Sequence, residues 1–146
     1  MLGGGLDGPG GREPAFDPLD VRRLAVAQDA LAGSVSALLR ALGAPEGILL
    51  AISGASGAHA PTRAESAALG QAGDLAVRGF AGLTGHLLEA QFPFAVALAA
   101  LAIAKGAPYP PFDPENEAPA GGAPEAAIAT AVGFHRFEGA ALLVAA

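Results

Sequence analysis

An uncharged run of apolar residues from Phe92 to Ala104 places the strongest constraint on what this chain can fold into. The run is shorter than the roughly 20 residues that a helix needs to cross a bilayer. It belongs to a helical pattern from His86 to Lys105 that is apolar on nearly every side, which is typical of a helix packed at the centre of a domain. We therefore expect a fully packed core helix with no membrane span, and a kink in it at Pro93.

The larger side chains of this helix should face the core, and they are Phe92, Phe94, Leu98 and Leu101. Upstream, a leucine-rich segment with a spacing of three to four predicts a helix from Asp20 to about Leu42. Pro61 suits the first turn of a short helix through Leu69. The glycines at 82 and 85 indicate a tight turn just before the apolar helix.

Short continuous apolar runs predict strands between these helices. Two of them, Ile48–Ile52 and Leu75–Phe80, lie before the apolar helix. Two more, Ala127–Phe134 and Gly139–Val144, follow a proline-rich loop and are close enough to form an antiparallel hairpin. This order predicts an α/β domain with a mixed sheet, packed with helices and closed by a C-terminal antiparallel hairpin.

Composition restricts the class of protein. With 146 residues, 52% of them hydrophobic and 15% charged, the chain has room for one globular domain. We expect that domain at residues 18–146, after a flexible glycine-rich tail at 1–17. A net charge of −6 argues against nucleic acid as a partner. The absence of cysteine excludes disulfides, thiolate metal sites and a cysteine nucleophile within this chain.

No signal peptide is evident, and a cytoplasmic location is the expectation. The three histidines show no metal-ligand spacing, so neither a metal nor any other cofactor is predicted.

The segment LTGHLLEA at 83–90 resembles the threonine-glycine-histidine turn of β-ketoacyl-acyl carrier protein synthases, in the thiolase superfamily. In that family the histidine donates a hydrogen bond to a thioester carbonyl. The resemblance extends over roughly residues 20–146, through a loop at 107–117, a turn at 132–139 and the last strand at 140–144. It also includes a strand and loop at 48–56, and Glu65 stands one residue out of register for a family glutamate.

The resemblance implies the C-terminal thiolase-like repeat as the fold. It implies a vestigial catalytic role for His86 and a substrate-binding role for Thr84, Gly85, Gly133 and Phe134. The more frequent role for a histidine in such a place is structural, and its ring would then pack in the core beneath the 82–85 turn.

Departures from the family pattern argue against catalysis by this chain alone. The nucleophilic cysteine belongs to an N-terminal half that the chain lacks. Ser53 stands at the position of a second histidine, and Ala81 at that of a lysine. Ser53 also lacks the flanking glycines of a nucleophile elbow, so we interpret it as a strand-end serine.

Three functions remain open. The chain is a non-catalytic partner of an active synthase in fatty-acid-type chain extension, or the C-terminal half of a split condensing enzyme, or a decayed fragment without acyl chemistry. The expected partners are a ketosynthase-like protein or further copies of the chain, with acyl carrier protein as another candidate. The family's repeat begins with a strand in the middle of its sheet, and the segment before Asp20 offers none. Either another chain supplies that strand or the sheet closes differently.

Overall fold

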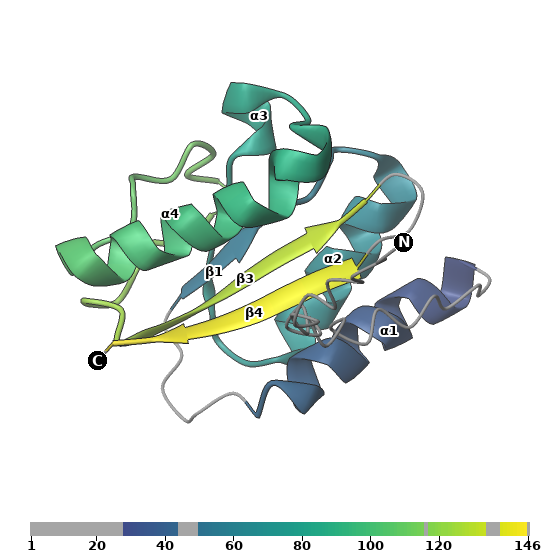
Figure 1. Ribbon diagram of the computed structural model, residues 1–146, viewed down its shortest axis with the longest axis horizontal. Coiled ribbons are helices and arrows are strands. Elements are labelled where there is room, and N and C mark those ends of the chain that lie inside the picture. Colours follow the sequence, from purple (N-terminus) through teal and green to yellow (C-terminus); the bar gives the residue numbers. More distant parts are fainter. Residues whose placement is uncertain (1–27, 44–49, 116, 134–137, 146) are drawn as a thin grey trace, which may run out of the picture.

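A four-stranded sheet forms the centre of the computed structural model, which describes residues 28–43, 50–115, 117–133 and 138–145 (Figure 1). The expected tail at 1–17 lies outside these residues. The strand order is β2-β1-β3-β4. The strands are β1 (Leu50–Ser53), β2 (Ala76–Gly79), β3 (Ala126–Val132) and β4 (Glu138–Val144). Because β1 is parallel to β2 and β3 while β4 is antiparallel to β3, the predicted mixed sheet with its C-terminal antiparallel pair is confirmed.

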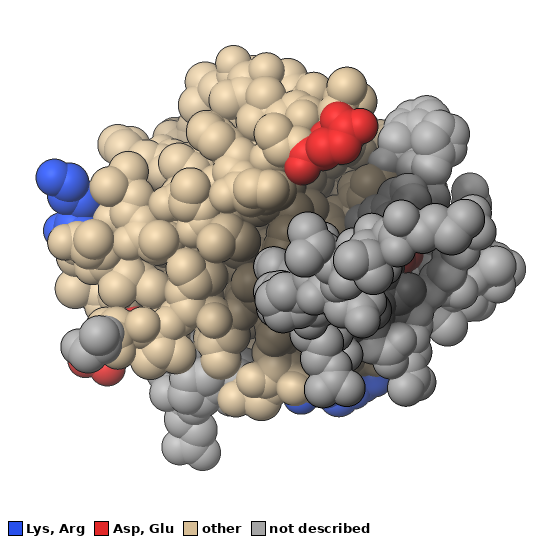
Figure 2. Space-filling model, viewed as in Figure 1, with Lys and Arg blue, Asp and Glu red and all other residues tan. Residues whose placement is uncertain are grey.

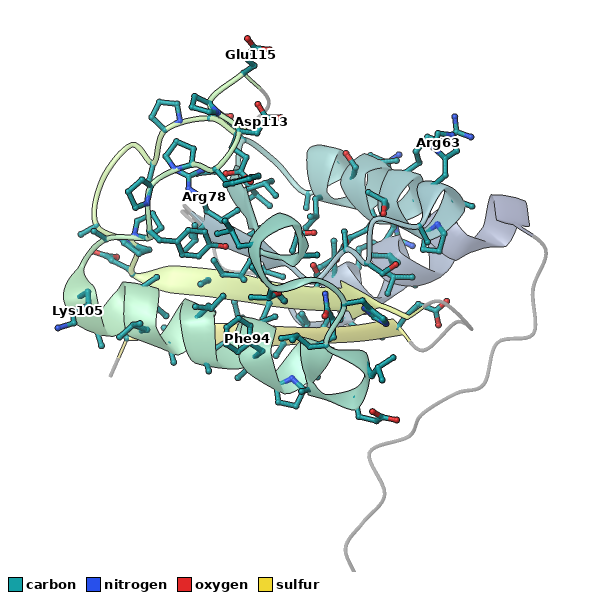
Figure 3. The ribbon with its side chains drawn as sticks, turned by 90° about the horizontal axis from the view of Figure 1, so that it is seen from above. Arg63, Arg78, Phe94, Lys105, Asp113 and Glu115 are labelled. Atoms are coloured by element: carbon teal, nitrogen blue, oxygen red, sulfur yellow. The ribbon has the colours of Figure 1, made fainter. Side chains whose placement is uncertain are left out.

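Helices cover both faces of the sheet. The helices α1 (Gln28–Ala41) and α2 (His59–Gln71) lie on one face, and α4 (Gln91–Lys105) lies on the other, as Figures 1 and 3 show. Alternate strand residues face opposite sides, and each side has its own apolar cluster. Ile128 and Val132 of β3 pack with α1 and α2, whereas Ala127 and Ala129 pack with α4.

The sheet closes without a strand between β1 and β3. These two strands are direct parallel neighbours, with Leu50 opposite Ala127 and Ser53 opposite Thr130. The sequence left two alternatives open, a strand supplied by another chain or a sheet that closes without it. The described residues form the second, because β1 pairs directly with β3. Alanine makes this compact arrangement possible, because Ala95, Ala99 and Ala102 of α4 are buried against the alanines of β3.

The apolar helix begins later than predicted. Residues 81–84 form a helical turn, α3 (Ala81–Thr84), and Leu88–Ala90 form a 3-10 turn before α4 starts at Gln91. Gly85 and Leu88 adopt left-handed backbone conformations, with φ of 70° and 53°, which interrupt a continuous helix. The predicted kink at Pro93 is wrong for the same reason. Pro93 falls in the first turn of α4, where its missing N–H would have no helical acceptor.

The prediction that α4 is packed on all sides is also wrong. Its buried residues are Gln91 and three alanines, whereas Phe94 and Leu101 are 36% and 53% exposed. By length and composition alone, the described segment Leu88–Lys105 could cross a membrane, with a mean hydropathy of 1.4, and 22% of it is buried inside the fold. The alanines of α4 thus face the sheet, Val96, Leu98 and Ile103 are partly buried against the same cluster, and Phe94 and Leu101 are exposed.

The proline-rich loop after α4 is held against β2 by polar contacts that the sequence analysis missed. Arg78 of β2 is 2% exposed and donates to the carbonyl oxygens of Tyr109 (3.1 Å) and Ala118 (2.7 Å). Glu117 accepts from the backbone N–H of Gly79 at 3.0 Å, and Tyr109 donates to the Gly79 carbonyl at 3.1 Å. In Figure 3, Arg78 lies beneath the loop that bears Asp113 and Glu115. The loop therefore covers the outer edge of β2.

We predict that Arg78→Met destabilises the fold by about 2–4 kcal/mol, because it removes the donor that the Tyr109 and Ala118 carbonyls share and leaves a buried position without its hydrogen bonds. Urea unfolding followed by circular dichroism measures this change. The control is Arg63→Met, which alters an exposed arginine of α2 and should shift stability by less than about 0.5 kcal/mol. Equal midpoints for the two variants would show that the loop does not depend on Arg78.

Candidate functional site

The carboxyl ends of the parallel strands gather most of the residues that the sequence analysis selected. Ser53 ends β1, the turn with Thr84 and His86 follows β2, and Gly133 follows β3. The connection that leaves β1 runs over one face of the sheet through α2, and the connection that reaches β3 runs over the other face through α4. Ligands of α/β proteins commonly bind at the strand ends where the connections of two adjacent strands pass to opposite faces of the sheet.

At the end of β1 this edge is closed by a buried polar cluster. Ser53 donates to Glu65 Oε2 of α2 at 2.9 Å and accepts from the Ala55 N–H at 3.2 Å. Glu65 is 1% exposed, and Thr130, opposite Ser53 on β3, is fully buried. The interpretation of Ser53 as a strand-end serine is confirmed, because its hydroxyl is enclosed and already hydrogen-bonded.

Burial raises the pKa of Glu65 above its usual value, and the neighbouring hydroxyls of Thr130 and Ser53 oppose this effect without cancelling it. Within the described part of the chain, neither Glu65 Oε1 nor Thr130 Oγ1 has a hydrogen-bond partner of good geometry. A buried carboxylate with an unsatisfied oxygen is costly, so the protonated acid is favoured in the fold.

Gln91 joins this edge to the turn before α4. Its side chain donates to the Gly54 carbonyl at 3.0 Å and accepts from the Leu87 N–H at 2.8 Å. Gly54 in turn donates to the Thr130 carbonyl at 2.7 Å, and a Cβ at this position would lie 2.5 Å from that oxygen. In the sequence, the one sign of this linking role is that Gln91 is a polar residue directly before the apolar run that begins at Phe92.

The residues selected from the resemblance do not share an enclosed site. His86 is exposed, which makes the expected core histidine wrong, since the interruption at Gly85 and Leu88 places it outside the packed helix. Thr84 and Gly85 are exposed as well, and the Thr84 hydroxyl lies 2.9 Å from the Gly85 carbonyl. Gly133 is half-buried at the end of β3, and Phe134 lies outside the described residues.

An apolar pocket of about 380 Å³ opens beside α4, between α3 and the loop that follows α4. Its lining comes from all three segments and includes Phe80, Thr84, Phe94, Leu98, Leu101, Lys105 and Tyr109. Burial, with a smaller effect of the Glu117 carboxylate, raises the pKa of Tyr109 to about 12, so its hydroxyl remains a donor to Gly79. Of the residues selected from the resemblance that the structure describes, Thr84 contributes to this pocket.

Comparisons with protein-family models, with curated proteins and with solved structures find no match to this chain. The described residues contain no cluster of histidine and carboxylate side chains suited to a metal ion. The pocket and the closed edge are thus the features from which a function can be argued.

We predict that Glu65→Gln removes a pH dependence of stability. Between the usual pKa of 4.5 and the raised value, the folded chain keeps a proton that the unfolded chain releases. The free energy of unfolding contributed by Glu65 should therefore fall as pH rises through this window, then level off. Urea unfolding from pH 4 to 8 should show the variant gaining stability over the wild type as pH rises. The control is the exposed Glu115→Gln, and parallel curves for wild type and Glu65→Gln would contradict the assignment.

Proposed function

We propose that the chain is a non-catalytic partner of an active β-ketoacyl-acyl carrier protein synthase in cytoplasmic fatty-acid-type chain extension, and that it binds an acyl chain. The observation that supports this most directly is the apolar pocket beside α4. Its volume of about 380 Å³ lies within the range of small-molecule sites, about 300–1,000 Å³.

The chemistry of the pocket wall suits hydrocarbon. Apart from Thr84, Lys105 and Tyr109, the wall consists of apolar side chains. The hydroxyls of Thr84 and Tyr109 already lie within hydrogen-bond distance of backbone carbonyls. Away from Lys105, a ligand body with hydrogen-bonding groups would find few partners along this wall, whereas an acyl chain needs none. Lys105 stands at the end of α4 with its amine directed outward, where it could meet an anionic or polar head (Figure 3).

The absence of catalysis is supported by the residues at the strand ends. The chain has no cysteine, and Ala81 stands where the resemblance implies a lysine. Ser53 cannot replace the second histidine, because it is enclosed and bonded to Glu65. Nucleophilic catalysis requires an accessible, activated nucleophile, and at the closed edge the Ser53 hydroxyl is enclosed while burial favours the protonated form of its neighbour Glu65.

A partner surface is supported by the outer face of α4 and the turns before it. The exposed large side chains of this region are Leu83, Leu88, Phe94 and Leu101. Figure 2 shows this face with few charged side chains, one of them a red group near the turns that lead into α4. Several large apolar side chains exposed on one helix and the turns before it favour a protein partner.

We predict that the purified chain alone does not form a β-ketoacyl product from acyl and malonyl thioesters. The assay is product formation by mass spectrometry with acyl carrier protein supplied. Turnover by the pure chain would refute the non-catalytic role. Turnover that appears only with a separate cysteine-bearing half, and is lost without this chain, would favour a split enzyme instead.

We also predict that Leu101→Asp weakens binding of dodecanoyl-pantetheine by at least about tenfold, because it places a carboxylate on the apolar pocket wall. Leu101 is 53% exposed, so the fold should tolerate the change. The matched control is Leu88→Asp, which alters an equally apolar residue, 67% exposed, outside the pocket lining. Calorimetry measures both variants, and equal losses would show that the ligand does not occupy this pocket.

A further inference from the structure

We infer that two copies of this chain pair along β4, antiparallel about a two-fold axis at Ala141, so that their sheets become one continuous sheet. This inference concerns a different surface from the face of α4 and does not rest on the proposed function. It follows from the direction of the backbone groups of β4, from the sizes of its side chains and from the contrast between the two sheet edges.

The backbone directions can be derived from the register. The Thr130 carbonyl accepts from Gly54, so Thr130 directs its backbone groups toward β1. Successive residues of a strand direct their backbone groups to opposite sides. Ala129, which precedes Thr130, therefore directs its N–H and C=O toward its partner Ala141 on β4. The alternate β4 residues Ala140, Leu142 and Val144 therefore direct their N–H and C=O groups to the outer edge.

Within the described part of the chain, these outward groups of Ala140, Leu142 and Val144 have no hydrogen-bond partner. Figure 1 shows β4, in yellow, as the last strand on its side of the sheet. The opposite edge of the sheet, at β2, is covered by the loop after α4. There Glu117 and Tyr109 form hydrogen bonds with the backbone N–H and C=O of Gly79. Proteins usually protect an edge strand with a covering loop, a proline or a charge. β4 contains no proline, and its one charged residue, Glu138, stands at its first position, so residues 139–144 carry no charge.

The side chains of β4 are complementary to themselves in one register. Pairing about Ala141 places Ala140 opposite Leu142 of the second copy, and Gly139 opposite Leu143. Each leucine then faces a small residue, so neither face of the joined sheet becomes crowded. The same register places outward backbone groups opposite outward backbone groups, as an antiparallel ladder requires. A two-fold pairing of this kind is self-complementary and closed, which yields a dimer and not a fibre.

The register makes a prediction that a different interface would not satisfy. Ala141 faces Ala141 of the second copy directly, with Cβ atoms about 4.5–5.5 Å apart. Ala141→Lys or Ala141→Glu would each place like charges together, and dimerisation should weaken by about 100-fold or more. An equimolar mixture of the two variants would place opposite charges together and should restore the dimer.

Sedimentation velocity of the full chain at about 1–100 µM is the test. The expected results are a wild-type dimer, monomers for each charged variant, a dimer in their mixture and an unchanged dimer for Leu88→Asp. Circular dichroism reports whether the variants fold. If they do not, Ala140→Pro replaces them, because it removes an outward N–H at an edge position that tolerates proline. A monomeric wild type, a dimer that Ala141 substitutions or Ala140→Pro leave intact, or a dimer lost in Leu88→Asp would each overturn the inference.

Discussion

The direct pairing of β1 with β3 is the constraint on which the rest of the structure depends. Each of the other strands adds to one side of this pair, and the helices pack on its two faces. Gly54 extends the pairing beyond the end of β1 through its bond to Thr130. Because a side chain at residue 54 would collide with that carbonyl, the close approach requires glycine.

That pairing also explains why the strand ends are closed. In many α/β folds the carboxyl ends of the strands open into a ligand crevice. Here Ser53 and Thr130 are adjacent, Glu65 of α2 is buried beside them, and Gln91 fastens the opposite turn to Gly54. The polar groups at this edge bind one another, and the accessible pocket lies instead beside the C-terminal half of α4. The described residues therefore form an apolar pocket beside α4, while the strand ends, where a ligand crevice would be expected, are closed.

The small residues of α4 have two consequences. Alanines on its inner side let it approach β3 closely, and two of its larger residues, Phe94 and Leu101, are exposed on the outer side. An alanine core buries less apolar area per residue than one of leucine or phenylalanine, so the fold gains less from its own interior. Polar contacts compensate in part, as Arg78 does by holding the loop on β2. Among the described residues, Phe94 and Leu101 of α4 stay exposed and β4 is the last strand on its side of the sheet.

How far the sequence predicts this protein can be judged element by element. The order of helices and strands, the antiparallel end of the sheet and the role of Ser53 followed from local patterns, because continuous apolar runs and a 3–4 spacing depend on near neighbours in the chain. The start of α4 did not follow, since left-handed residues at Gly85 and Leu88 interrupt a run that is apolar throughout. The expectation that Phe94 and Leu101 face the core was wrong, because a helix that is apolar all round gives no direction for its buried side. The cluster around Glu65, the Arg78 contacts and the pocket join residues from distant parts of the chain. Only the tertiary structure decided them, because hydrogen bonds and cavities depend on which elements the packing brings together.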